Sequence, residues 1–369
     1  MRFCSRRMIK RKSIAKIFGF LSLLYLSYLL GVFTHFLEKD FSSNFKISSS
    51  AEINEFPVNK NFDINNHNYK FLYDSEQTCN KNAENGKTEL VILVKSKLSH
   101  FEQRNSIRST WGDKKANEKS LIRLVFLLGI PSPDEELEDE HHQMDFDDNL
   151  NALERKNEIF SSKRELSLNG MLKAENKLYS DIVQQNFHDT YYNNTLKAIM
   201  GLQWIDKYCS QSEYYLFIDD DYYLNPKLLV EYLKYNIQNN QTILNSLYGG
   251  FVFKNSSPMR HRFSKWYISL DEYPYDKFPP YVSAGCYILS KKSADLFLKA
   301  TKLITLFRFD DIYLGILAYK LQIEPLNINQ IYFYPPEFDD KHYVENIIAS
   351  HGFSPSLLKD TWKKIYKSM

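Results

Sequence analysis

The chain has 369 residues, of which 43% are hydrophobic and 15% aromatic, enough to build a large core. A net charge of +2 argues against a dedicated nucleic-acid-binding protein, and 12 Gly and 12 Pro residues are too few for a low-complexity chain. Four cysteines exclude a disulfide scaffold, and no two of them have the close spacing of a zinc site.

The N-terminal region has the pattern of a membrane anchor. Residues 1–16 carry seven Lys or Arg and no acid, and the 21 residues from Ile17 to Leu37 carry no charge. A helix of that length spans the roughly 30 Å hydrocarbon core of a bilayer. A cleaved signal peptide fits less well, because the run is longer than the usual apolar region and no small-residue cleavage site follows it. The basic flank predicts a cytosolic tail over 1–16, a type II signal anchor over 17–37, and a lumenal remainder.

Several features agree with a lumenal location for the rest of the chain. Three glycosylation sequons begin at Asn193, Asn240 and Asn255. The cysteines on this side are Cys79, Cys209 and Cys286. Their odd number leaves at least one free or paired between chains. Residues 38–87 are rich in Ser, Asn and Lys without a sustained period, which predicts a stem.

A globular domain is expected over residues 88–369. Leu90–Val94 and Leu121–Gly129 are apolar runs typical of buried strands, and the basic link between them predicts a parallel βαβ unit. Residues 130–170 interrupt this pattern, with nine acids and no base between Asp134 and Asp148. Runs of like charge usually stay solvated, so this segment is expected to be a surface insertion.

The most informative stretch is an acidic triplet directly after an apolar run. A helix over 196–208 leads to Tyr214–Ile218, which is typical of a buried strand and runs straight into Asp219, Asp220 and Asp221. Three adjacent carboxylates repel one another, so they lie either in water or around a cation. Oxygen ligands at the carboxyl end of a strand favour Mg²⁺ or Mn²⁺ shared with substrate phosphates, and an acidic surface turn is the alternative.

Three further segments contain candidate binding or catalytic residues. Residues 265–281 interleave Tyr and Trp with Asp and Pro, which suits either a core or a platform for sugar rings. The strand expected over 282–290 contains Gly285, where another backbone or ligand comes close. Asp310 and Asp311 precede an apolar helical pattern, where helix capping is the plain alternative to catalysis. An acidic metal loop, a second carboxylate pair and a lumenal anchor together suggest a nucleotide-sugar enzyme.

The chain resembles the β1,3-glycosyltransferase family (glycosyltransferase family 31), which includes β1,3-galactosyl- and β1,3-N-acetylglucosaminyltransferases. The matching blocks, in chain order, are Arg104–Gly112, Val125–Gly129, Asp181–Gln184, Asn193–Lys197, Phe217–Asp221, Tyr281–Gly285 and Asp310–Gly315. Within the family, Ser257–Tyr267 and Leu306–Asp311 look most like the brainiac-like group.

The resemblance implies an α/β fold of the GT-A type with a mostly parallel sheet, a Golgi type II membrane protein, Mn²⁺, and inversion at the sugar C1. It implies metal ligands at Asp221 and Asp219, completed by His351, with His342 as the competing histidine. Donor-binding residues implied by it are Arg104, Arg108, Trp111, Lys197, Asp219 and Asp220. Acceptor-binding residues are expected at Trp266, Tyr267, Tyr281 and Gly285. The base maps to Asp311, and Asp310 stands where the family commonly has Glu.

The expected activity is β1,3 transfer of a hexose or N-acetylhexosamine. The brainiac-like group is similar to enzymes that add GlcNAc from UDP-GlcNAc to mannosyl-glucosylceramide, so the partners implied are a UDP-sugar donor, a glycolipid or glycan acceptor and a membrane. A homo-oligomer is compatible with these features, whereas a nucleic-acid partner is not expected. The alternatives are transfer of galactose from UDP-Gal and a catalytically silent carbohydrate-binding member.

Overall fold

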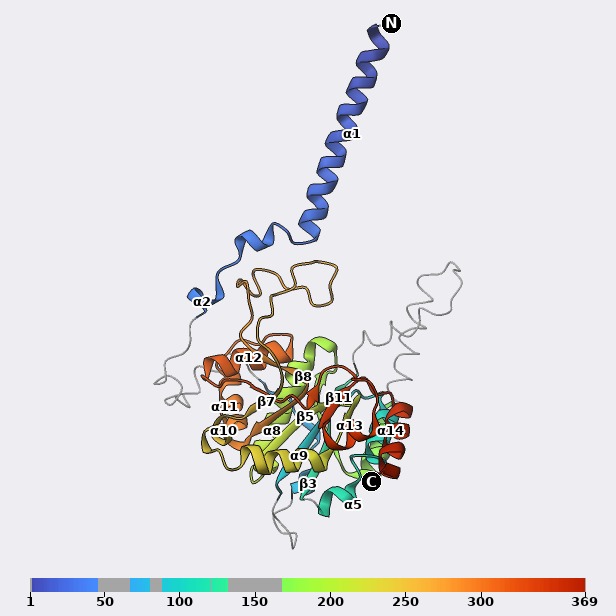
Figure 1. Cartoon of the computed structure of the whole chain (residues 1–369), viewed down its shortest axis with the longest axis vertical. Helices are drawn as coiled ribbons and strands as arrows, with labels where there is room; N and C mark the ends of the chain where they lie inside the picture. Colours follow the sequence, from blue (N-terminus) through green and yellow to red (C-terminus); the bar gives the residue numbers. More distant parts are fainter. Residues whose placement is uncertain (1, 46–66, 80–87, 120, 132–167, 369) are drawn as a thin grey trace. The chain divides into compact units, whose positions relative to one another are not determined.

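The computed structural model describes residues 2–45, 67–79, 88–119, 121–131 and 168–368, which belong to two compact units (Figure 1). The N-terminal unit comprises Met1–Ile47 and Lys254–Pro280, and the sheet unit comprises Ser48–Phe253 and Tyr281–Met369. The expected acidic insertion falls almost wholly on residues 132–167, outside the described residues.

The sheet unit is built on an eight-stranded sheet with the order β1-β4-β3-β2-β5-β8-β7-β9. Its strands are β1 (Phe71–Tyr73), β2 (Leu90–Lys95), β3 (Ile122–Ile130), β4 (Ile182–His188), β5 (Tyr214–Asp219), β7 (Tyr248–Phe253), β8 (Tyr281–Ser290) and β9 (Leu326–Asn327). The four central strands β4, β3, β2 and β5 run parallel, and β8 joins β5 antiparallel. The expected α/β fold with a mostly parallel central sheet is therefore confirmed.

The helices of the sheet unit pack on this sheet. They are α4 (Phe101–Arg108), α5 (Lys114–Lys119), α8 (Asn194–Tyr208), α9 (Pro226–Tyr232), α10 (Gln241–Ser246), α11 (Lys291–Thr301), α12 (Asp310–Lys320), α13 (Asp340–Glu345) and α14 (Pro355–Ser368). A π-helical turn over Leu233–Ile237 continues α9, and 3-10 turns lie at Glu76–Cys79 and Tyr191–Asn193. Asn225 caps α9, because its side chain accepts a hydrogen bond from Leu228 N at 3.1 Å.

The two faces of the sheet follow from the two-residue period of its strands. Leu90, Ile92 and Val94 of β2 share one core cluster with Ile107 of α4 and Leu358 of α14. On α8, a Cβ at Gly201 would collide with the ring of Phe217 from β5, so this helix lies closely against the sheet. All six residues of β2 are buried, which is typical of a central parallel strand covered on both faces.

A small three-stranded sheet brings the C-terminal region to the acidic triplet. It consists of β10 (Ile331–Tyr332), β11 (Ala349–His351) and β6 (Tyr222–Leu224), in that order. Strand β6 starts directly after Asp221 and pairs antiparallel with β11, so that Tyr222 lies opposite His351. The chain therefore carries a distant histidine to the end of β5.

Part of the expected stem belongs to the sheet unit instead. Strand β1 pairs antiparallel with β4 at the sheet edge, and Cys79 forms a disulfide with Cys209 across 130 residues of sequence. Cys286 is free and buried. Pairing to a distant strand and a disulfide both hold residues 71–79 on the sheet, although their composition predicts a linker.

The N-terminal unit differs from the expected single helix over 17–37. Helix α1 spans Arg2–Leu29, and Gly31 with φ of 76° ends it in the left-handed region that glycine favours. A 3-10 turn follows over Thr34–Leu37, and the short helix α2 covers Phe41–Asn44. Among the helices of the described ranges, none has both the length and the apolar character required to span a bilayer.

Candidate active site

The acidic triplet and the second carboxylate pair meet at one lysine. Asp219 is the last residue of β5 and lies opposite Lys95, the last residue of β2, in the parallel register. The Lys95 Nζ atom is 3.0 Å from Asp219 Oδ1 and 3.0 Å from Asp310 Oδ2 at the start of α12. Lys95 thus connects two acidic motifs that are far apart in the sequence.

Burial and neighbouring charges determine the pKa values of Lys95 and Asp219. Burial alone would lower the pKa of Lys95, but Asp219 and Asp310 outweigh it and raise that pKa above its ordinary value. Burial, opposed by Lys95, raises the pKa of Asp219 to about 7. Sequence reasoning missed Lys95, although a lysine ending the apolar run Leu90–Val94 is a usable signal.

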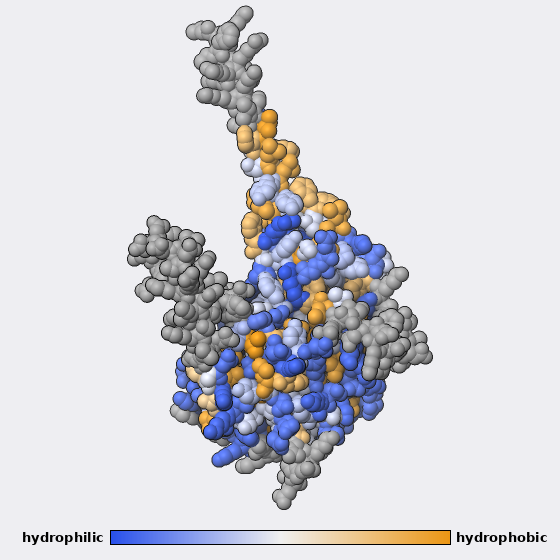
Figure 2. Space-filling model, turned by 180° about the vertical axis from the view of Figure 1, so that it is seen from behind, coloured by the Kyte–Doolittle hydropathy of each residue, from blue (hydrophilic) through white to orange (hydrophobic). Residues whose placement is uncertain are grey.

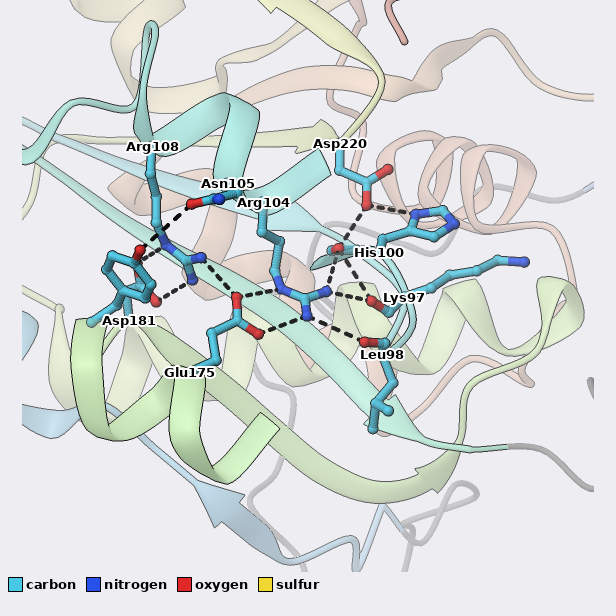
Figure 3. Close-up of polar contacts among 11 residues, drawn as sticks. Lys97, Leu98, His100, Arg104, Asn105, Arg108, Glu175, Asp181 and Asp220 are labelled. Atoms are coloured by element: carbon cyan, nitrogen blue, oxygen red, sulfur yellow. Dashed lines mark hydrogen bonds and ion pairs between the residues drawn. The ribbon is translucent and has the colours of Figure 1, made fainter. Parts of the chain in front are cut away.

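Asp220 is held by a network that begins at Arg104 (Figure 3). Its Oδ2 atom accepts hydrogen bonds from Ser96 Oγ at 2.6 Å and lies 2.9 Å from His100 Nδ1. Arg104 is fully buried, donates to Ser96 Oγ at 3.2 Å, and forms a two-pronged ion pair with Glu175. Arg104 therefore fixes the loop after β2, which in turn fixes Asp220.

The other expected donor-binding residues occupy similar supporting positions. Lys197 donates to the Ser96 carbonyl at 2.6 Å and pairs with Asp189 at 2.7 Å. Arg108 pairs with Asp181 at 2.8 Å, and its guanidinium lies 4.0 Å from the centre of the Tyr179 ring. Burial would lower the pKa of Arg108, but Asp181 and Glu175 raise it, so the guanidinium stays charged.

Trp111 supports the turn that carries the triplet. It is buried on α4's C-terminal side, and its Nε1 donates to the carbonyl of Tyr222 at 3.1 Å. This contact holds the first residue of β6 and hence the backbone just after Asp221. For Arg104, Arg108, Trp111 and Lys197, direct contact with a donor stays a prediction.

Asp221 and His351 form the pair best suited to a cation. His351 Nε2 is 2.9 Å from Asp221 Oδ2, and this hydrogen bond is the main cause that raises the pKa of His351. The other oxygen, Asp221 Oδ1, is buried and has no hydrogen-bond partner among the described residues. His342 instead lies on α13, where its backbone N–H donates to Asp339. The structure therefore selects His351 over His342 as the neighbour of Asp221.

These two residues fit a Mn²⁺ ion that shares its coordination with phosphate oxygens. Carboxylate and imidazole are ligand types that Mn²⁺ accepts, and such cations are commonly held by one or two protein groups plus substrate phosphates. No cluster of three or more His, Cys, Asp or Glu side chains arranged for a metal occurs in the described part of the chain. Asp219, expected as a further ligand, is engaged by Lys95 instead.

Asp310 and Asp311 occupy the first turn of α12. Asp310 is buried against Lys95, while Asp311 Oδ1 accepts a hydrogen bond from Ile312 N at 2.8 Å. Burial, with the neighbouring Asp310 charge, raises the pKa of Asp311 to about 7. A carboxylate with this pKa is well matched to proton abstraction near neutral pH. Simple N-capping does not describe this turn, because the residue at the N-cap is Phe309 and makes no capping bond.

The expected acceptor residues fall in both units. Gly285 on β8 lies so close to Tyr222 that a Cβ would collide with the Tyr222 hydroxyl, which places Gly285 beside the acidic turn. Tyr281 is buried and stacks on Phe253 with ring centres 5.2 Å apart. Trp266 and Tyr267 belong to the N-terminal unit. Their binding of an acceptor stays a prediction.

Two of the three sequons present exposed asparagines. Asn240 and Asn255 are exposed, whereas Asn193 is half-buried and its Nδ2 donates to the His188 carbonyl at 2.8 Å. An asparagine must offer its amide nitrogen to be glycosylated, so Asn240 and Asn255 are the better placed of the three.

Comparison with known proteins adds a consistent set of relatives. The family model described as Galactosyltransferase matches residues 160–329. The chain is 32% identical over 356 residues to Beta-1,3-galactosyltransferase brn of Drosophila melanogaster, covering 96% of each chain. It is 29% identical over 300 residues to Beta-1,3-galactosyltransferase 1 of Mus musculus, covering 81% of this chain and 79% of that one. Identity to Beta-1,3-galactosyltransferase 5 of Homo sapiens is 28% over 281 residues, covering 76% and 79% respectively.

Proposed function

Since the chain belongs to the β1,3-glycosyltransferase family and is a hexosyltransferase, we propose that it is an inverting, Mn²⁺-dependent enzyme with a GT-A fold. It transfers a hexose or N-acetylhexosamine from a UDP-sugar to a hydroxyl of a glycan. The observation that carries this proposal is the Lys95 bridge, because it joins the donor-side triplet at Asp219 to the acceptor-side pair at Asp310.

Asp311 is the base in this proposal. It takes the proton of the acceptor hydroxyl while that oxygen forms a bond to the sugar C1. The bond from C1 to the phosphate oxygen breaks on the opposite face, so the electron pair leaves with UDP and the configuration inverts. Asp310, held by Lys95, orients the first turn of α12 and with it Asp311.

Asp221 and His351 would hold the cation, which when bound neutralises the charge of the departing diphosphate. Asp220 stands between them and the loop after β2, where Ser96 and His100 fix its carboxylate. The support of this loop by Arg104 keeps the donor side rigid, as an active site requires.

The donor we favour is UDP-GlcNAc and the acceptor a mannosyl-glucosylceramide-type glycolipid, on the likeness of residues 257–267 and 306–311 to the brainiac-like group. A second candidate is galactose transfer from UDP-Gal, which the printed names of the relatives support. The basic residues 1–16 and the uncharged run 17–37 support a type II protein of the Golgi membrane with a lumenal sheet unit.

The test is transfer by the full-length chain in detergent, with UDP-GlcNAc or UDP-Gal, Mn²⁺ or chelator, over a panel of glycolipid acceptors. We expect turnover that requires the cation and is lost in Asp311→Asn, while binding of UDP with Mn²⁺ survives. Asp295→Asn is the matched control, because Asp295 is an exposed residue of α11. Near-normal turnover in Asp311→Asn would refute the assignment of the base, and absence of turnover with both donors would favour a catalytically silent member.

A further inference from the structure

Within the N-terminal unit, residues 254–280 are fastened to the chain that follows α1. Arg260 is fully buried, and its Nε lies 2.7 Å from Glu38 Oε1. Its two terminal nitrogens donate to backbone carbonyls, namely those of Ile268, Ser269, Tyr273 and Tyr275. One guanidinium thus folds the segment and ties it to Glu38 with charge-assisted bonds.

The attachment begins at the very end of α1. Arg262 N donates to the Leu29 carbonyl at 3.0 Å, and the Arg262 guanidinium lies 4.5 Å from the centre of the Tyr28 ring. A Cβ at Gly31 would collide with the backbone of Arg260, so only glycine permits this approach. Residues 260–262 therefore lie against the last turn of the helix and the turn that follows it.

The exposed side chains of residues 259–267 are apolar, aromatic and basic. Phe263 is 68% exposed, Trp266 50% and Met259 43%. The stretch 259–267 also carries two exposed basic side chains, Arg262 and Lys265, and no acid. Exposed apolar residues continue along the chain after α1, at Val32, Phe33, Phe36 and Leu37. Figure 2 shows the described part of α1 as a largely apolar surface.

A surface of this composition, which follows the uncharged end of α1, has the character of a membrane interface. Trp and Tyr gather at the headgroup level of bilayers, and Arg and Lys contact phosphates there while their stems cover apolar surface. In water, by contrast, large exposed apolar side chains clustered on one segment are a cost to the protein. The basic charges of residues 259–267 complement phospholipid headgroups rather than an acidic protein core.

We propose that residues 259–267, together with 32–37, form a membrane-seating surface that rests on the phospholipid bilayer where α1 emerges. The inference rests on the membrane anchorage proposed above and deepens it. Trp266 and Tyr267, expected as acceptor-binding residues, then lie at headgroup level, where the glycan of a membrane lipid starts.

The test uses the full-length chain in nanodiscs that contain phospholipids brominated near the headgroup end of the acyl chain. Bromine quenches tryptophan fluorescence only at short range, and the chain has four tryptophans, of which Trp111 and Trp204 are buried in the sheet unit. We expect brominated lipid to quench the wild-type chain and Trp266→Phe to lose most of that quenching. Placing tryptophan at the neighbouring exposed position, as Phe263→Trp in the Trp266→Phe background, should restore it.

The outcomes separate this inference from the proposed function. A chain that incorporates into nanodiscs but shows equal lipid quenching in wild type and Trp266→Phe overturns the seating surface alone. Quenching of Trp266 by aqueous acrylamide but not by brominated lipid also overturns the membrane-seating surface. Protection from both quenchers, with crosslinking between chains, would assign the surface to a second copy. Failure to incorporate at all would overturn the anchorage, whereas the transfer assay tests the chemistry independently.

Discussion

Replacing Lys95 with methionine removes the positive charge from the bridge between Asp219 and Asp310. Methionine keeps much of the side-chain volume, so the change acts on charge more than on packing. Both carboxylates lie 3.0 Å from Lys95 Nζ, and Lys95 is only 4% exposed in its side chain. The variant therefore leaves two acids near each other without the cation that compensates them.

The expected cost follows from this burial. Removing one partner of a buried ion pair typically destabilises a protein by about 3–5 kcal/mol, because the remaining charge has no partner. A domain of this size loses roughly 2–4 °C in Tm per kcal/mol, so the expected loss is on the order of 6–20 °C. Transfer should fall as well, since Asp310 no longer holds the first turn of α12.

Thermal unfolding and glycosyl transfer by the full-length chain measure these two effects. Lys299→Met is the matched control, because Lys299 forms an exposed pair with Asp295 on α11 and should unfold like the wild type. Adding Asp310→Asn to Lys95→Met should recover part of the lost stability, since one uncompensated charge disappears. Unfolding of Lys95→Met within a degree of the wild type, or further destabilisation by Asp310→Asn, would contradict this expectation.

Two other predictions concern the base and the disulfide. Because burial raises the pKa of Asp311 to about 7 and the carboxylate must be ionised to accept a proton, transfer should rise with pH up to about 7 and level off above it. At pH 5 the rate should be about 100-fold below the plateau, and a pH-independent rate between 5 and 7 would contradict the assignment. Replacing both Cys79 and Cys209 by serine should lower the free energy of unfolding by about 2–5 kcal/mol, because the disulfide closes a long loop. Reductant should lower the Tm of the wild type and of Cys286→Ala but leave the double variant unchanged; an equal response of all three would show that the bond is not formed.

The sequence was most informative where one local pattern carries the signal. The run Tyr214–Ile218 predicts a buried strand, and the structure confirms that Asp219 ends it and that Asp220 and Asp221 lie in the turn. Asn225 and Pro226 likewise mark the start of α9 by their own chemistry. These features depend on neighbours in the chain, so they can be predicted without knowledge of the tertiary fold.

Features that depend on distant pairing could not be predicted in this way. The Lys95 bridge requires the register of β2 with β5 and the start of α12, and no local pattern encodes either. Selection of His351 requires the pairing of β6 with β11. Residues 71–73 follow a stretch whose composition predicts a linker. They nevertheless form an edge strand, because the backbone of β4 is available to pair with them.

The helix expected over 17–37 shows a second reason why a helix boundary cannot be predicted from hydropathy. Hydropathy records that the run lacks charge, but it does not record that Gly31 ends the helix with φ of 76°, nor that Arg260 leaves no room for a Cβ at this position. The packing partner lies more than 200 residues away in the sequence. A hydropathy pattern therefore identifies the uncharged run but not the residue at which the helix ends, which is Leu29.

The pairing of β7 with β8 has a consequence for how such enzymes diversify. Phe253 and Tyr281 are register partners, so the whole segment 254–280 leaves the sheet and returns to it at a single rung of the ladder. Its length and sequence can change without shifting any strand, because the entropy of closing a loop grows only slowly with its length. Exchanging residues 254–280 between relatives, with junctions at Phe253 and Tyr281, would therefore replace one surface and leave the acidic edge of the sheet intact.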